Sequence, residues 1–73
     1  MARYFFDIID GQVLPDMEGA DFASPAQARA EAIATAGEML RDAGLRSWDG
    51  SEWRMLVRDE ESRTVLSLRF SAE

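Results

Sequence analysis

The strongest constraint in the sequence is an alternation of apolar and polar residues on both sides of an acidic turn near the C-terminus. Every second residue is apolar in 52–59 and again in 64–70, and Glu60-Glu61-Ser62-Arg63 separates the two segments. This period of two is typical of strands with one buried face. A symmetric turn pairs Asp59 with Thr64, Val57 with Leu66, Met55 with Leu68 and Trp53 with Phe70. A shift of one residue would mix these apolar pairs with arginines, so the pattern predicts one register.

A second hairpin is predicted at the N-terminus. Residues 3–9 are rich in aromatic and β-branched side chains, and Asp10-Gly11 follows them directly. Asp-Gly between apolar segments predicts a two-residue type I′ turn, because both central residues need positive φ. Residues 12–14 then return as a strand, with Ile8 opposite Val13.

The segment after this strand is predicted to be a loop. Pro15 cannot donate a hydrogen bond to a neighbouring strand, so the short strand before it belongs at a sheet edge. Residues 16–22 include Gly19 and the three acids Asp16, Glu18 and Asp21. Their spacing does not match an EF-hand, and we expect solvated loop acids rather than a calcium site.

A helix start is marked by three residues that agree. Ser24-Pro25 supplies a capping side chain and a residue suited to the first helical position, and Gln27 completes a capping box. Apolar residues then recur at helical spacing: Ala28, Ala32, Ala36, Leu40 and Ala43. Gly44 is a natural C-cap, so a helix is predicted over 25–43. Gly37, within the alanine-rich helix, is expected to mark its closest approach to the sheet.

These elements predict a single α+β domain over residues 1–73, in the order ββαββ. The four strands form one antiparallel sheet of order 2-1-3-4, because Pro15 suits an edge and the most apolar strand suits the centre. One helix covers one face. The predicted core consists of Tyr4, Phe6, Ile8, Val13, Ala32, Ala36, Leu40, Val57, Leu66 and Leu68. With only 73 residues the stability margin should be thin or supported by a partner.

The other face of the predicted sheet mixes arginines with apolar residues. It collects Arg3, Phe5, Asp7, Ile9, Leu14, Arg54, Leu56, Arg58, Val65, Ser67 and Arg69. The register sets Arg54 opposite Arg69, and like charges that face each other destabilise a strand pair. Arginine stems that cover apolar neighbours on a solvated face are one interpretation. A partner surface is the other, and the coincidence of exposed apolar residues with unpaired like charges favours it. Its expected residues are Arg3, Phe5, Ile9, Arg54, Leu56, Arg58, Val65 and Arg69.

Charge and composition exclude several classes of chemistry. The chain has no cysteine and no histidine, which removes disulfides, thiolate chemistry and any mechanism that needs an imidazole. Its net charge of −6 opposes nucleic-acid binding, although Phe5 beside arginines on an open sheet is a feature of single-strand RNA platforms. The acids of the turn at 59–61 and the turn formers Asp10 and Asp49 form no shielded carboxylate pair. We expect no enzyme, no metal, no cofactor and no membrane segment.

Four segments together resemble a family of short bacterial proteins classed as a domain of unknown function. They are the opening RYFF-x-I-x-DG (3–11), the D-x-EG at 16–19, the ARAEA of the helix (28–32) and the closing V-x-DE…VLSL (57–68). This resemblance implies a small stand-alone domain in the cytoplasm and no particular activity. The stretch VLPDMEG (13–19) is also similar to HicB-type antitoxins, in which a strand ends in Pro-Asp-Leu-x-Gly before an alanine-rich helix. That resemblance implies a toxin-binding domain joined to a DNA-binding element, for which the terminal hairpin leaves no room.

The functional expectation is therefore a small interaction module that binds an acidic protein surface through its open sheet face. The surface would belong to another protein or to a second copy of the chain, whose helix offers the acids Glu31, Glu38 and Asp42. Arginine–carboxylate pairs would relieve the repulsion between Arg54 and Arg69. The alternative is an antitoxin-like regulator linked to nucleic acid.

Overall fold

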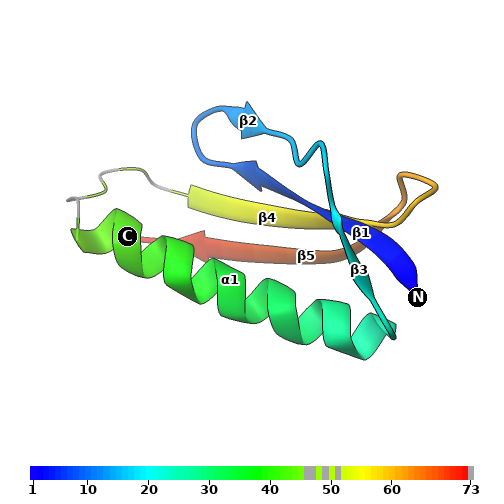
Figure 1. The fold of residues 1–73 in the computed structure, drawn as a ribbon. Helices are drawn as coiled ribbons and strands as arrows, with labels where there is room; N and C mark the ends of the chain where they lie inside the picture. Colours follow the sequence, from blue (N-terminus) through cyan, green and yellow to red (C-terminus); the bar gives the residue numbers. More distant parts are fainter. Residues whose placement is uncertain (46–47, 49, 51, 73) are drawn as a thin grey trace.

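The computed structural model describes residues 1–45, 48, 50 and 52–72, and within them the chain is α+β. The elements are β1 (Ala2–Ile9), β2 (Val13–Leu14), β3 (Ala20–Phe22), α1 (Pro25–Leu45), β4 (Glu52–Arg58) and β5 (Thr64–Ser71). All strand pairs are antiparallel, and the sheet path is β2-β1-β4-β5 with β3 also paired to β1 (Figure 1). The helix lies along one face of this five-stranded sheet (Figure 1). No described helix combines the length and apolar character that crossing a membrane requires.

The added strand β3 corrects the predicted ββαββ layout. Residues 16–22 were expected to be a loop, but Ala20–Phe22 pairs with Ala2–Tyr4 at the N-terminal end of β1. β2 pairs with the C-terminal end of the same strand, so β2 and β3 are two short pieces that together accompany β1. Residues 15–19 form the loop between β2 and β3, and this loop interrupts the strand pairing along β1. The four predicted strands keep their relative positions along the sheet, and the fifth completes the edge beside β1.

The first turn is longer than predicted by one residue. Ile9 lies opposite Val13 and Ile8 opposite Leu14, so the loop has three residues rather than two. The Asp10 N–H donates to the Gln12 carbonyl (3.0 Å), and Gly11 adopts φ +74°. The shift exchanges the faces of the two strand residues: Leu14 joins the helix side, and Val13, predicted to be core, is 64% exposed.

The second hairpin has the predicted register over most of its length. Trp53 lies opposite Phe70, Met55 opposite Leu68 and Val57 opposite Leu66. The predicted pairing of Asp59 with Thr64 is wrong, because Arg58 lies opposite Thr64 and the register shifts there. Val65 is the extra residue of this bulge. The turn itself is closed by Asp59, whose N–H donates to the Arg63 carbonyl and whose carboxylate accepts the N–H groups of Glu61 and Arg63.

The helix begins as predicted and ends later than predicted. The Gln27 N–H donates to Ser24 Oγ (3.2 Å), and the Gln27 side chain accepts the Ala23 N–H (3.0 Å). The helix continues to Leu45, so Gly44 is an interior residue and not a C-cap. Gly37 is not at the closest approach to the sheet, since no described atom lies within 4 Å of the place a Cβ would take.

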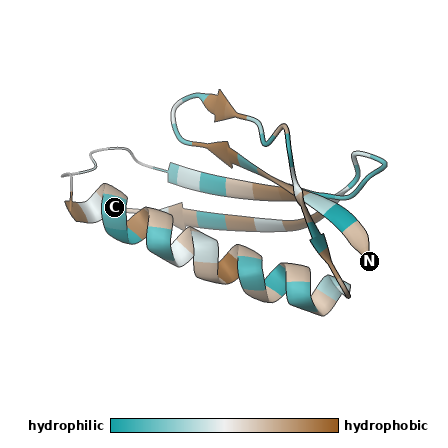
Figure 2. Ribbon diagram, viewed as in Figure 1, coloured by the Kyte–Doolittle hydropathy of each residue, from teal (hydrophilic) through white to brown (hydrophobic). Residues whose placement is uncertain are grey.

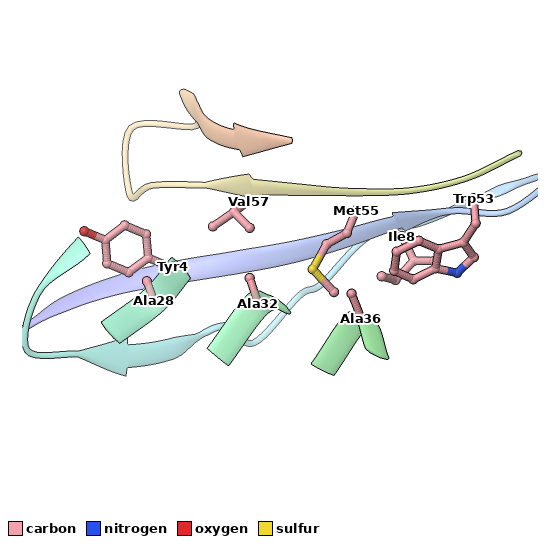
Figure 3. Close-up of a cluster of buried hydrophobic side chains, with 8 residues drawn as sticks. All are labelled: Tyr4, Ile8, Ala28, Ala32, Ala36, Trp53, Met55 and Val57. Carbon is pink, nitrogen blue, oxygen red and sulfur yellow. The ribbon is translucent and has the colours of Figure 1, made fainter. Parts of the chain in front are cut away.

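The core lies between the alanine stripe of α1 and the inner face of the sheet (Figure 3). Its buried residues are Tyr4, Ile8, Ala28, Ala32, Ala36, Trp53, Met55 and Val57. Phe6, Leu40, Leu66 and Leu68 were predicted to be core and pack against it while partly exposed, together with Phe22 and Trp48. Because alanine side chains are short, the helix axis can lie close to the strands, and Met55 and Val57 are the largest side chains buried completely.

The end of the molecule near the C-terminus of α1 is closed by Trp48. Its indole Nε1–H donates to Asp10 Oδ1 (3.0 Å), and its ring lies 5.7 Å from that of Phe70. Asp10 therefore joins two distant segments in addition to forming its turn. The predicted turn at Asp49-Gly50 falls partly outside the described residues, because Asp49 is not among them.

Candidate functional site

The sheet face turned away from α1 is the candidate site, and the strand register determines which side chains share it. β1 contributes Arg3, Phe5, Asp7 and Ile9, β4 contributes Arg54, Leu56 and Arg58, and β5 contributes Ser67 and Arg69. Two predicted members lie elsewhere. Leu14 is opposite the buried Ile8, and Val65 lines a groove on the helix side together with Tyr4 and Ala28. Asp21 and Val13 take places on the open face instead.

Arg58 lies in one half of this face and donates three hydrogen bonds to other residues of the chain. Its Nε donates to Asp7 Oδ2 at 2.6 Å, and its Nη2 donates to Asp7 Oδ1 (3.3 Å) and to the Asp16 carbonyl (3.1 Å). The side chains of Arg58 and Asp7 are only 26% and 14% exposed. A two-pronged pair of this kind is stronger than an exposed ion pair, and removing one partner would leave the other charge poorly solvated. Arg58 is therefore a structural residue of the open face.

Asp16 organises the excursion between β2 and β3. Its Oδ1 accepts the backbone N–H groups of Glu18 (3.1 Å) and Gly19 (3.0 Å), and its Oδ2 accepts the Phe6 N–H (3.1 Å). Phe6 lies on β1 between the segments paired to β2 and β3, so the carboxylate replaces the strand carbonyl that is missing there. The Asp16 N–H in turn donates to Asp7 Oδ1 (2.9 Å). Asp16 is thus not the solvated loop acid that was expected.

Phe5 is enclosed between this loop and Arg58. The Arg58 guanidinium carbon lies 4.6 Å from the centre of the Phe5 ring, a cation–π contact. On the loop side, a Cβ at Gly19 would come within 2.8 Å of the Phe5 ring and of the Tyr4 carbonyl oxygen. Gly19 also has φ +70°, which a side chain disfavours. The ring expected to anchor a partner is instead part of the clamp that holds the loop.

Arg3 is also paired inside the molecule. Its guanidinium donates to Asp21 (Nε to Oδ1, 3.2 Å) and to the Glu18 carbonyl (2.7 Å). Asp21 lies directly opposite Arg3 in the β1–β3 pair, so β3 brings the carboxylate to this position. The backbone N–H of Arg3 donates to Glu60 at the tip of the second hairpin (2.9 Å). The Arg3–Asp21 ion pair and the hydrogen bond from Arg3 to Glu60 are both exposed, and each is expected to contribute little to stability.

The ionised state of the carboxylates on this half is favoured by their partners. The hydrogen bond from Arg58 lowers the pKa of Asp7, and it outweighs the opposing effect of burial. Burial raises the pKa of Asp16, but the hydrogen bonds from Gly19, Phe6 and Glu18 and the charge of Arg58 outweigh it, so the net shift is downward. Asp7 in turn raises the pKa of Arg58, mainly through its hydrogen bond.

Arg54 and Arg69 form the other half of the face, where the described residues offer no close carboxylate pair of this kind. They lie directly opposite one another in the β4–β5 pair, as predicted. Arg54 is half-buried, and its Nε is buried without a hydrogen-bond acceptor among the described residues. Arg69 is 67% exposed and reaches only Glu52, at 3.9 Å. The apolar side chains of Ile9 and Leu56 flank this pair through the neighbouring strand positions.

The described residues hold no group of three or more acids placed to bind a metal ion. Asp59 has a lowered pKa, chiefly because the Arg63 N–H donates to it, and this partly buried carboxylate holds its own turn. Asp7, Asp16 and Asp59 therefore bind backbone N–H and arginine groups of the chain itself. Sequence reasoning missed this use of Asp16, although Asp followed three residues later by Gly is a turn signal that could have predicted a side-chain-to-backbone bond.

A comparison with protein-family models assigns most of the chain. Residues 3–71 match the family described as Domain of unknown function (DUF6894). The chain belongs to this family. Comparison with curated proteins found no match, and comparison with solved structures found none either. The resemblance to a domain of unknown function is confirmed in that coarse form, and no comparison supports a relationship to HicB-type antitoxins.

Proposed function

We propose that the protein is a small non-enzymatic interaction module that binds an acidic surface of another protein. The contact would lie around Arg54 and Arg69 on the open face of the sheet. The observation that supports this most directly is the pair itself: two arginines face each other, and the Nε of Arg54 is buried with no acceptor in the described part of the chain. Like charges that face each other lower stability, Glu52 reaches Arg69 only at 3.9 Å, and a bound carboxylate would offset the remaining repulsion.

The chemistry of the partner follows from this geometry. Residues directly opposite in an antiparallel pair have Cα atoms about 4.5 to 5.5 Å apart, so one carboxylate or two adjacent ones can reach both guanidinium groups. Arginine favours such bidentate contacts. Ile9 and Leu56 would supply apolar contact beside the charges, and Val13, 64% exposed and opposite Ile9, extends the apolar surface. The fitting partner is an acidic segment that also contains apolar side chains.

The proposed site is narrower than the one predicted from the sequence. Arg3, Phe5 and Arg58 are engaged by Asp21, Gly19 and Asp7, so they hold the sheet edge in place and the partner would contact Ile9, Arg54, Leu56 and Arg69. The absence of an enzymatic role remains part of the proposal. A general acid or base near neutral pH needs a carboxyl pKa raised toward 7, whereas those of Asp7 and Asp16 are lowered. The resemblance to short bacterial proteins supports a cytoplasmic setting.

A peptide titration tests the proposal. The probe is a synthetic peptide that alternates glutamate and leucine, and a peptide of equal length that alternates arginine and leucine serves as its control. We expect calorimetry to show binding of the acidic peptide alone, weaker at high salt. The variant Arg54→Glu should lose this binding by about tenfold or more. Arg41→Glu, which changes the charge equally on an exposed helix position (75% exposed), should keep it.

The outcomes separate the candidate functions. Equal loss of binding in both variants would mean a general charge effect and would overturn the proposed site. The alternative, a regulator linked to nucleic acid, is tested with a DNA duplex and a single-stranded RNA under the same salt series. A salt-sensitive nucleic-acid complex that Arg54→Glu abolishes, without binding of the acidic peptide, would replace the proposal by that alternative.

A further inference from the structure

The two edges of the sheet differ in how well they are protected against pairing. One edge is formed by β2 and β3, which have two and three residues, and β2 is followed by Pro15. The other is formed by β5, which has eight residues and pairs with β4 alone among the described strands. Edge strands are usually protected by lysine, proline or shortness, but β5 contains no proline and the chain contains no lysine. Within the described residues, the outer edge of β5 therefore has no strand partner for its backbone groups.

Apolar side chains lie beside this open edge. Val65 is 53% exposed and Phe70 is 42% exposed on β5 itself. Arg29 lines the same groove as Val65, which places that flank of α1 next to β5. Ile33, one helical turn further along the flank, is 48% exposed. Figure 2 shows hydrophobic positions of β5 interleaved with hydrophilic ones, as expected for a strand that can extend a two-faced sheet.

The acids of α1 are on its other flank. Asp42 lines a hollow with Ile8 and Leu14, on the side of β1 and β2. Glu38 and Glu31 precede it by four and eleven residues and therefore share that flank. A second copy approaching the β5 side would meet Arg29 and the apolar Ile33 instead of these acids. The distribution of charge thus permits self-association along this edge.

We propose that β5 pairs antiparallel with β5 of a second copy of this chain, across a two-fold axis at Leu68. Opposite residues must point to the same face, so the axis passes through a residue and not between two. An axis at Leu68 sets Leu68 against itself, Leu66 against Phe70 and Ser67 against Arg69. The two helix-side pairs among these are apolar, and no like charges meet on the open side. An axis at Ser67 would instead set Arg69 against the bulge residue Val65, whose side chain lies on the other face, and this is a poorer match.

This dimer uses the edge of β5, whereas the proposed acidic-peptide site lies on the open face, and only Arg69 belongs to both. It joins the two sheets edge to edge, and the open faces of both copies stay accessible. It also increases the apolar area that a 73-residue chain can bury, which a domain of this size needs. The occupant is thus a second copy, since the strand is complementary to itself in sequence and charge.

Sedimentation over a concentration series of the full chain, with substitutions at Ser67, tests the position of the axis. The wild type is expected to sediment as a dimer that dissociates on dilution. Ser67→Glu creates two opposite-charge pairs with Arg69 across the axis and should tighten the dimer about two- to thirtyfold, whereas Ser67→Arg should weaken it similarly. If the axis were at Ser67, the new glutamates would face each other and Ser67→Glu would weaken the dimer. That result, or a monomer at every concentration, would overturn the proposal.

A second pair of variants tests the flank of the helix. Ile33→Glu should weaken the dimer, while Ala34→Glu, exposed on the adjacent position and facing away from β5, should not. Circular dichroism verifies that both variants fold. Equal effects of the two substitutions would overturn the assignment to the β5 side. So would a dimer that is lost in Arg54→Glu and kept in Ile33→Glu, because the contact would then lie on the open face.

Discussion

The open face has two halves that contain the same residue type in opposite situations. In the half beside β2 and β3, Arg58 makes a close two-pronged pair with Asp7 and also donates to the loop. In the half near the start of β4 and the end of β5, Arg54 and Arg69 face each other without a close carboxylate among the described residues. Both halves have the alternation typical of a sheet face. They differ because residues 15–21 bring acids and backbone carbonyls to the first half alone.

The difference shows that arginines on the same sheet face need not form a single binding surface. Where the chain supplies its own acceptors, the arginines fix a loop and are unavailable to a partner. Where the described residues supply no close acceptor, like charges face each other, and this arrangement is expected to lower stability. Sites that lower stability are expected where function requires them.

The largest effect is expected from removing the carboxylate that organises the first half. Asp16→Ala takes the acceptor away from three backbone N–H groups, including that of Phe6 on the central part of β1. We expect a loss of about 3 kcal/mol in the free energy of unfolding, at roughly 1 kcal/mol for each bond. Urea denaturation followed by circular dichroism measures it. Glu18→Ala is the control in the same loop and should change little, because only the backbone of Glu18 makes hydrogen bonds there.

The second-largest loss of stability is expected from a substitution at Gly19, the loop residue that lies against the Phe5 ring. Gly19→Ala would combine a left-handed backbone with contacts of 2.8 Å to the Phe5 ring and to the Tyr4 carbonyl oxygen, and we expect a loss of about 2 to 3 kcal/mol. Gly11→Ala is the matched control, since Gly11 has a similar φ of +74° and open space around it. It should cost about 1 kcal/mol. Equal losses in the same denaturation assay would show that backbone conformation alone matters and that Phe5 is not held by the loop.

A matched pair of arginine substitutions compares the two halves directly. Arg58→Leu leaves Asp7 without its partner and should destabilise the protein by about 2 kcal/mol. Arg54→Leu removes a buried unpaired donor and the repulsion with Arg69, and should be neutral or stabilise by up to about 1 kcal/mol. Thermal unfolding of both variants gives the sign. A loss in Arg54→Leu as large as that in Arg58→Leu would contradict the division of the face.

The smallest effect is the response of the first half to acid. In the folded state the pKa values of Asp7 and Asp16 are lowered from 3.8, so unfolding takes up protons in acid. Their stabilisation is complete above the unfolded pKa and is lost as the pH falls from about 5 through the folded values. Urea midpoints measured along this range should decline. Arg58→Leu should make the decline shallower, because its hydrogen bond is the main cause of the Asp7 shift; an unchanged slope would contradict that cause.

Local signals in the sequence predicted the helix start and the second hairpin well. The Ser24 cap, the alanine stripe and the register from Trp53 to Val57 all occur in the structure, because each depends on residues a few positions apart or on one face pattern. The end of the helix was predicted too early, since Gly44 adopts helical conformation. The first turn was predicted one residue too short, and that single residue moved Val13 out of the core and Leu14 to the helix side.

The candidate site was predicted as a set of residues but not as two halves. The sequence correctly placed Arg54 opposite Arg69 and placed Arg3, Phe5 and Arg58 on the same face. It gave no reason to expect Asp16 and Asp21 near them, because those contacts depend on how β3 returns along β1. The contacts with the arginines join residues that are 18 positions apart (Arg3 and Asp21) and 42 positions apart (Arg58 and Asp16), beyond the reach of local pattern.

The sequence by itself determined the class of fold, the helix and its alanine stripe, and the alternation that puts arginines on one sheet face. These features follow from turn chemistry and from the periods of helix and strand, which are local properties. Only the tertiary structure decided which arginines have hydrogen-bond acceptors within the chain. Asp16 reaches Phe6 and Arg58 because the chain folds back along β1, whereas no described acid reaches the Nε of Arg54. A charge pattern predicts where side chains point. Whether a charged side chain has an oppositely charged or hydrogen-bonding partner depends on contacts between segments far apart in the chain.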